Sequence, residues 1–127
     1  MINLQFKTLD GDFTIHRYNK SSTLPENVFK SEFYWIGRTD DELSIVCDSK
    51  CKLNSDKYES GWKALKLIGP FKFSEVGIVS GITKLLAEKG ICVFVLSTFD
   101  TDYILVKKEN LTLAVTALVA SDYSIIQ

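Results

Sequence analysis

The chain has 127 residues, of which 46% are hydrophobic and 24% are charged, and its formal net charge is −1. A chain of this length folds as one domain or as two small, closely packed units. The near balance of 15 basic and 16 acidic residues argues against a protein that binds nucleic acid by neutralising phosphates. The high hydrophobic fraction and low net charge also argue against a disordered chain.

Three further features of the sequence indicate the cellular compartment of the protein. The longest apolar run, residues 91–96, is far shorter than the roughly 20 residues of a membrane-spanning helix. Residues 1–7 lack the basic start and long apolar centre of a signal peptide. The three cysteines, Cys47, Cys51 and Cys92, fit reduced thiols better than a disulfide framework. We therefore expect a cytoplasmic protein that does not enter a membrane.

The first half of the chain is rich in predicted strands, which we expect over residues 4–7, 12–17, 33–38 and 43–47. Asp10-Gly11 is typical of a hairpin turn, and residues 19–27 predict a loop. Residues 39–42, Thr-Asp-Asp-Glu, have the pattern of a capping box and predict a short helical turn. Because no long helix is indicated, we interpret this half as a reduced α+β unit that must pack on the second half.

A polar stretch over residues 48–61 separates the two halves and is typical of a loop or linker. We therefore expect an N-terminal unit over residues 1–60 and a C-terminal domain over residues 61–127.

The second half begins with a strand and a helix. Residues 62–68 alternate apolar and polar side chains, as a half-buried strand does. Ser74 is predicted to be the N-cap of a helix, and Glu75 in the first turn would suit the helix dipole. Apolar residues then recur at helical spacing, namely Val76, Val79, Ile82, Leu85 and Leu86. Gly90 is expected at the C′ position, where the helix ends.

Residues 91–96 and 103–106 predict two strands, and the short turn between them makes them antiparallel neighbours. A second helix is indicated by Leu111, Ala114, Val115 and Leu118. A short strand over residues 122–126 ends the chain. The order β-α-β-β-α-β is that of the ferredoxin-like fold, an antiparallel sheet with both helices on one face. The predicted fold class is α+β.

Two groups of residues in this half have the chemistry of a small-ligand site. Free N–H groups at the start of the helix attract an anion such as a carboxylate, and Gly77 permits close approach. Asp100 and Asp102, near Glu75, would hold an ammonium or guanidinium group, and Phe99 would supply an apolar wall. The same residues also have a purely structural interpretation, in which the acids are surface or turn residues and Phe99 belongs to the core.

Other chemistries have little support in the sequence. His16 is the only histidine, and Cys47-x-x-x-Cys51 lacks the second pair of ligands that a structural zinc site needs. The chain contains no glycine-rich nucleotide loop and no G-x-S-x-G motif. We therefore expect no metal, no cofactor and no catalytic activity.

Two strings carry a resemblance to a known family. The first is residues 37–46, and the second joins residues 61–66 and 73–78 with residues 96–106, in which Ser97–Tyr103 is the most specific part. Together they resemble the small bacterial proteins built from two ACT-like halves, which are related to the ACT domains of cytosolic arginine sensors. The resemblance implies an ACT fold and a regulatory protein that binds an amino acid where ACT domains pair.

The resemblance also implies a set of ligand-binding residues at this interface. They are Glu75, Val76, Gly77, Ile78, Thr98, Phe99 and Asp102. Lys72 departs from the family pattern, because the sensors carry a glycine there. A lysine at this position would crowd the pocket or repel a cationic ligand.

Three hypotheses follow. The leading one is an amino-acid sensor that forms a homodimer, binds a free amino acid, a basic one included, and acts on a regulated protein partner. The second is a dimerisation or protein-interaction module without a ligand. The third is an enzyme, for which the sequence offers no set of base, nucleophile and orienting residue.

Overall fold

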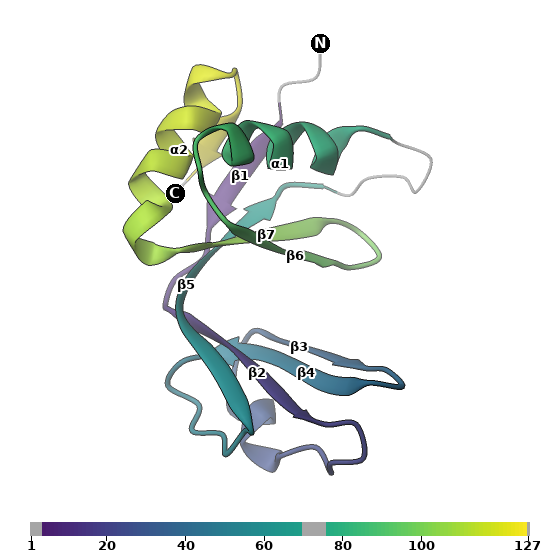
Figure 1. Ribbon diagram of the computed structural model, residues 1–127. Coiled ribbons are helices and arrows are strands. Elements are labelled where there is room, and N and C mark those ends of the chain that lie inside the picture. Colours follow the sequence, from purple (N-terminus) through teal and green to yellow (C-terminus); the bar gives the residue numbers. More distant parts are fainter. Residues whose placement is uncertain (1–3, 70–75, 127) are drawn as a thin grey trace. The chain divides into compact units, whose positions relative to one another are not determined.

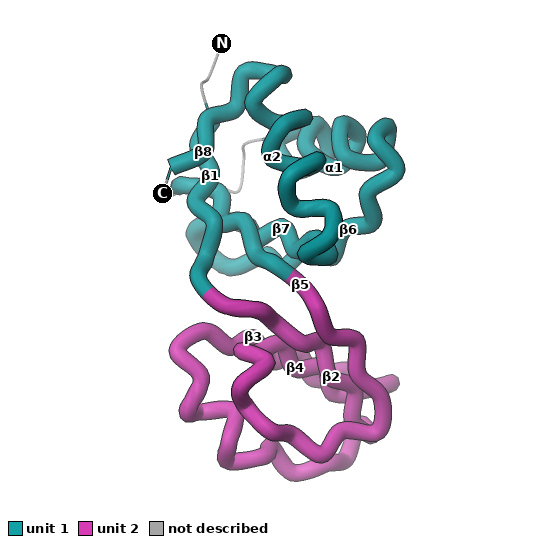
Figure 2. Tube along the Cα trace, turned by 90° about the vertical axis from the view of Figure 1, so that its left-hand side faces the viewer, with its two compact units in different colours: residues 1–10, 63–127 teal, residues 11–62 magenta. Residues whose placement is uncertain are grey.

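A computed structural model describes residues 4–69 and 76–126. The chain forms two compact units: unit 1 comprises residues 1–10 and 63–127, and unit 2 comprises residues 11–62 (Figure 2). This division differs from the expected one at the start of the chain. The first strand was placed in the N-terminal unit because it is near that unit in sequence, whereas its backbone pairs with strands of unit 1.

The described residues of unit 1 form a five-stranded sheet and two α-helices. Its elements are β1 (Gln5–Thr8), the end of β5 (Lys57–Leu67), α1 (Ile78–Glu88), β6 (Val93–Ser97), β7 (Asp102–Lys107), the short 3-10 turn η2 (Lys108–Asn110), α2 (Leu111–Ala120) and β8 (Ser124–Ile126). The strand order is β8-β1-β5-β7-β6. From β5 onward the elements follow the predicted order β-α-β-β-α-β, and the α+β class is confirmed.

The N-terminal strand changes the predicted sheet. β1 pairs antiparallel with β5, where Phe6 lies opposite Leu67, and parallel with β8, where Phe6 lies opposite Ile125. The expectation of a fully antiparallel sheet is therefore wrong at the β1–β8 pair. The predicted hairpin turn at Asp10-Gly11 is also wrong, because β1 and β2 (Phe13–Asn19) do not pair with each other but each with β5.

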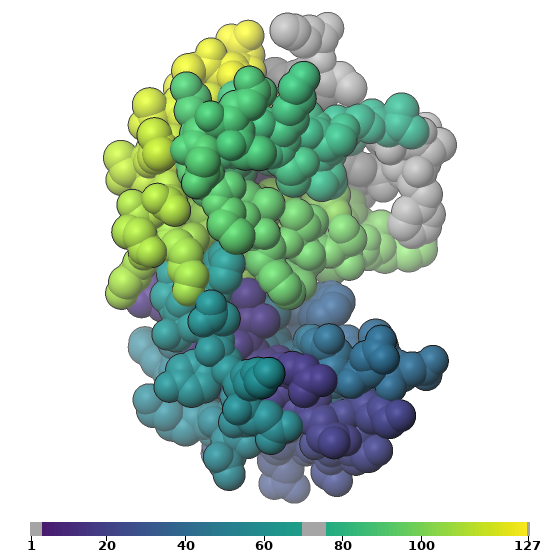
Figure 3. Space-filling view, viewed as in Figure 1, coloured from purple at the N-terminus to yellow at the C-terminus, as the bar shows by residue number. Residues whose placement is uncertain are grey.

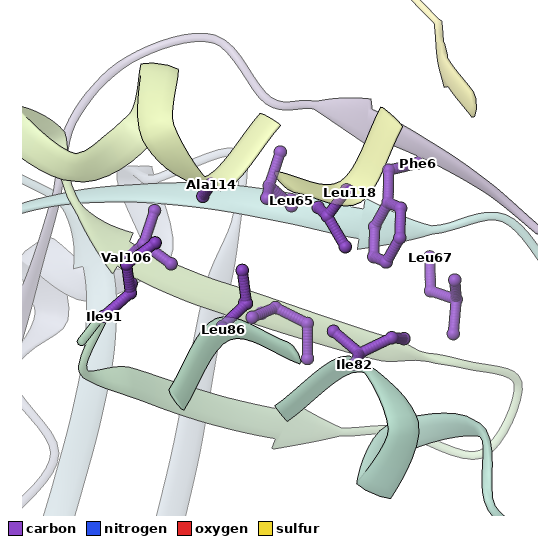
Figure 4. Close-up of a cluster of buried hydrophobic side chains, with 10 residues drawn as sticks. Phe6, Leu65, Leu67, Ile82, Leu86, Ile91, Val106, Ala114 and Leu118 are labelled. Atoms are coloured by element: carbon purple, nitrogen blue, oxygen red, sulfur yellow. The ribbon is translucent and has the colours of Figure 1, made fainter. Parts of the chain in front are cut away.

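The core of unit 1 lies between the sheet and the two helices (Figure 4). Both helices place apolar residues in this one cluster, so they cover the same face of the sheet, as Figure 1 shows. The buried members are Phe6, Leu65, Leu67, Ile82, Leu86, Ile91, Ile104, Val106, Ala114 and Leu118. The predicted antiparallel pairing of β6 with β7 is confirmed, with Val93 opposite Val106 and Ser97 opposite Asp102.

The C-terminal end of α1 is a Schellman motif, as Gly90 predicted. Gly90 has φ +72°, its N–H donates to the carbonyl of Ala87, and the N–H of Ile91 donates to the carbonyl of Leu86. We expect Gly90→Ala to lower the free energy of unfolding by about 1 kcal/mol, because a Cβ is unfavourable at positive φ. Urea denaturation measures the change. A substitution that left the midpoint unchanged would contradict this assignment.

Unit 2 is a four-stranded antiparallel sheet with only one short helical turn. Its elements are β2, the 3-10 helix η1 (Glu26–Lys30), β3 (Tyr34–Arg38), β4 (Glu42–Asp48) and the beginning of β5, and the strand order is β3-β4-β2-β5. The predicted helical turn over residues 39–42 is wrong: residues 39–41 connect β3 to β4, and Glu42 is the first residue of β4. The Thr39 hydroxyl accepts the N–H groups of Asp41 and Glu42, as in a capping box, but the chain continues as a strand.

The expected linker over residues 48–61 is shorter than predicted, because β5 begins at Lys57. In unit 2 this strand lies at the edge of the sheet, and its residues 57–60 are exposed. An exposed edge strand shows no apolar alternation, which explains why the polar sequence was taken for a loop. Gly61, with φ +81°, lies where the β2–β5 register shifts, as expected for a β-bulge.

Candidate functional site

The start of α1 and the β6–β7 turn, which hold the described members of the two predicted groups, lie at the same end of unit 1. Thr101 donates a hydrogen bond through Oγ1 to the carbonyl of Leu67, the last residue of β5, and so fixes the β6–β7 turn beside the end of that strand. The chain leaves β5 at this end and enters α1 at Ile78. Figure 1 shows the start of α1 and the β6–β7 turn on the same side of unit 1, and Figure 3 shows the turn at the surface.

The first turn of α1 has no side-chain cap among the described residues. Gly77 is the N-cap and has a left-handed backbone with φ +82°. Its carbonyl accepts the N–H of Gly81 at 3.0 Å and the hydroxyl of Ser80 at 3.2 Å. The N–H groups of the first helical residues, from Ile78 onward, have no acceptor within the helix, and the helix dipole adds a partial positive charge there. This end of the helix therefore suits an anionic group.

The described residues leave room at Gly77, at this end of the helix. A Cβ built on Gly77 meets no other atom of the described chain within 4 Å. Val76, directly before it, is 88% exposed, whereas Ile78 packs partly against the core of unit 1. Among the described residues, nothing therefore crowds the Cβ position of Gly77.

The helix begins later than the sequence predicted. Ser74 was expected to cap it, but the N-cap is Gly77, because its positive φ interrupts the helical backbone. Val76, which was expected to face the core, precedes the helix and is exposed. Ser74, Glu75 and Lys72 lie outside the described residues, so the expected roles of Glu75 and Lys72 stay predictions.

The β6–β7 turn is held by its two threonines. The N–H of Thr98 donates to the carbonyl of Thr101 at 2.8 Å, and the N–H of Thr101 donates to Oγ1 of Thr98 at 3.3 Å. Thr98, which was predicted to bind the ligand, therefore stabilises this turn. Sequence analysis missed Thr101, which is buried and anchors the turn to β5. The sequence signal that could have indicated Thr101 is the Thr-Phe-Asp-Thr pattern, which is typical of a turn held by threonine hydroxyl groups.

Phe99 and Asp102 present the accessible chemistry of the turn. Phe99 is 78% exposed, which excludes its alternative interpretation as a core residue. Asp102, the first residue of β7, accepts a hydrogen bond from the Ser97 hydroxyl through Oδ1 and is half-buried. A partly buried carboxylate beside an exposed aromatic ring is suited to an ammonium or guanidinium group.

Three further observations concern metal binding, membrane insertion and a hollow in unit 2. Within residues 4–69 and 76–126, no three histidine, cysteine or acidic side chains are grouped so that they could hold a metal ion. The same residues form no helix with the length and apolarity required to cross a membrane. In unit 2, an open hollow is lined by Gly11, Asp12, Asp48, Ser49, Lys50 and Lys52.

Comparison with known proteins points to one family. A model of the ACT domain matches residues 57–120, and a second model, which describes an N-terminal domain, matches residues 11–56. The human putative protein CASTOR3P is 30% identical in an alignment 110 residues long that covers 76% of this chain and 67% of that protein.

Solved structures agree with this result. Protein Atu0741 from Agrobacterium tumefaciens is 36% identical, with a TM-score of 0.90 over 99% of this chain and 94% of that one. E. coli aspartokinase III, solved in complex with aspartate and ADP, shares the fold with a TM-score of 0.60 and 13% identity, over 92% of this chain and 32% of that one. Since the ACT domain model covers half of the chain, the protein belongs to the ACT domain family.

Proposed function

We propose that this protein is a non-catalytic regulatory ACT protein that binds a free amino acid at the end of unit 1 where α1 begins. The observation that carries the proposal is that a helix N-terminus without a side-chain cap among the described residues shares this end with the Phe99–Asp102 turn. Membership in the ACT domain family supports the regulatory role, and the relatives reported above fit it.

The zwitterion fits the charges of the site. Its α-carboxylate accepts hydrogen bonds from the first N–H groups of α1, beside the open space at Gly77. Its ammonium group, or a basic side chain, pairs with Asp102 and with Glu75. Phe99 and Val76, both exposed, form the apolar wall. Lys72, if it enters the site, favours a neutral or acidic side chain on the ligand over a basic one.

For the protein to regulate a partner, binding of the amino acid must also shift an equilibrium between two arrangements of the protein. We propose that two copies pair as a homodimer in the cytoplasm, with the amino acid at the ACT interface. A ligand shifts an equilibrium only by its difference in affinity between two states. The amino acid therefore acts by binding one arrangement of the paired domains more tightly, which a partner protein then recognises.

Asp102→Asn tests this site. The asparagine keeps an acceptor for Ser97 and removes the charge, so affinity for the amino acid is expected to fall about tenfold or more, the value of one charge-assisted hydrogen bond. A thermal-shift screen of all common amino acids identifies the ligand, and calorimetry measures its dissociation constant. Glu88→Gln, an equal loss of charge at the other end of α1, is the matched control. If Asp102→Asn and Glu75→Gln both bind like the unchanged protein, the site assignment fails.

The second candidate function is a ligand-free dimerisation module. Two observations favour this function. Val76 and Phe99 are exposed apolar side chains, and β6 is an edge strand of the unit 1 sheet. This function predicts a concentration-dependent dimer with no thermal shift for any amino acid. A ligand-induced shift of the melting temperature in the screen would instead support the amino-acid sensor.

A further inference from the structure

A segment of unit 2 covers one face of its sheet together with the 3-10 helix η1. This cover segment, residues 49–56, is held by side chains of β2: Thr14 Oγ1 lies 2.7 Å from Ser49 Oγ, and His16 Nδ1 lies 2.8 Å from Ser55 Oγ. Asn27 also donates to a backbone carbonyl of the segment at 3.0 Å. Two of its side chains, Cys51 and Leu53, pack against the buried cluster of this face.

The buried cluster against which Cys51 packs contains a second cysteine, Cys47. Cys47 is fully buried in β4, and it belongs to the same cluster against which Cys51 packs. A tight turn brings the chain back, because the N–H of Cys51 donates to the carbonyl of Asp48 at 3.0 Å. Both thiols are free, and they lie close enough for Cys51 to contribute to the raised pKa of Cys47. Cys92, in contrast, is an exposed free thiol of unit 1.

The two thiols differ in access, and the environment of Cys47 also changes its acidity. Burial raises the pKa of the Cys47 thiol to about 12, with further contributions from Cys51 and Asp48, so Cys47 stays protonated at neutral pH. Cys51 is partly exposed and can meet a dissolved oxidant. A partly exposed thiol next to a protected second thiol is the arrangement of a peroxide-reactive cysteine with a resolving cysteine.

We propose that Cys47 and Cys51 form a reversible disulfide when the protein meets a hydroperoxide. The Cys51 sulfur attacks the peroxide, the O–O bond breaks, and Cys51 becomes a sulfenic acid as one water leaves. The Cys47 sulfur then attacks the Cys51 sulfur, the S–O bond breaks, and the Cys47 proton leaves with the hydroxyl as a second water. Two thiols are oxidised by two electrons, and one hydrogen peroxide is reduced to two waters.

The bond would tie the cover segment covalently to β4. Side-chain and backbone hydrogen bonds hold the segment in the reduced protein, and the disulfide adds a link that denaturant does not break. This modification site is in unit 2 and does not depend on the amino-acid site proposed for unit 1. Its test therefore stands whether or not a ligand is found.

The test uses the full chain with Cys92→Ser, so that only the two thiols of unit 2 remain. After stoichiometric hydrogen peroxide, we expect both thiols to disappear together in a thiol assay under denaturing conditions, with a mass loss of two hydrogens. Trypsin then yields residues 39–50 joined to the dipeptide 51–52, and dithiothreitol separates them. Both thiols are expected to return on reduction.

Cys51→Ser in the same background is the matched variant, and a circular-dichroism spectrum like that of the parent shows that it is folded. In this variant we expect the Cys47 thiol to survive the same treatment. The proposal is overturned if the parent keeps both thiols, if its mass rises by oxygen atoms without a joined peptide, or if Cys47 is lost as fast without Cys51. A disulfide that links two chains instead of one also overturns it.

Discussion

Phe6→Ala is expected to lower the free energy of unfolding by about 3–5 kcal/mol, the cost of removing a large aromatic side chain from a packed core. Phe6 is fully buried between β5 and β8 and packs at a ring-centroid distance of 5.7 Å from Tyr123. Truncation therefore leaves a cavity among side chains from β1, β5 and α2. Urea denaturation followed by circular dichroism measures the change.

The control is Leu113→Ala. Leu113 is 47% exposed on α2, so its truncation is expected to change the stability by less than about 0.5 kcal/mol. Hydrogen exchange adds a positional test, because Phe6→Ala should speed exchange at the amides of β5 and β8 while those of β3 and β4 are unaffected. Equal stability of Phe6→Ala and the unchanged protein would show that β1 is not part of the core of unit 1.

The position of β1 shows what sequence patterns cannot supply. Residues 4–7 predicted a strand, and the strand exists, shifted by one residue. Its partners are more than 50 residues away, at Leu67 and Ile125, and no local pattern specifies such a pairing. The β6–β7 hairpin was predictable because its partners are joined by a short turn, and α2 because its buried residues recur at helical spacing.

The candidate site was predictable in its residue types but not in its local backbone. Ser74 has the side chain of an N-cap, so propensity favoured it over Gly77. The positive φ of Gly77, which sets the start of α1, is not indicated by the residue types around it. Thr98 and Asp102 were selected as ligand contacts, yet both also make hydrogen bonds within the hairpin. A ligand at this site therefore meets side chains that are already held in place.

Buried polar groups of unit 2 were missed for a related reason. His16 was interpreted only as a metal ligand lacking a partner, because one sequence position gives no burial. The side chain is 5% exposed, its Nδ1 bonds Ser55, and its Nε2 has no hydrogen-bond partner in the described part of the chain. The ring of Tyr58 lies 6.3 Å away, centroid to centroid, from the neighbouring strand β5.

This environment makes the stability of the protein depend on pH. Burial lowers the pKa of His16 below its usual value of 6.5, because a charged imidazolium loses its hydration there. Below about pH 6.5 the unfolded chain therefore binds a proton that the folded chain does not, and the free energy of unfolding falls as the pH falls. The stability is fully present above the unfolded pKa, and the slope below it is positive and stays under the one-proton limit of about 1.4 kcal/mol per pH unit.

Urea denaturation at a series of pH values between about 5.5 and 7.5 measures this slope above the range in which carboxylates titrate. His16 is the only histidine, so a slope in this range belongs to it. His16→Gln keeps a polar partner for Ser55 but does not titrate, and its stability is expected to be flat across the same range. A slope that persists in His16→Gln would assign the effect to another group, and a flat profile in the unchanged protein would mean that the folded chain hydrates His16 and accepts its charge.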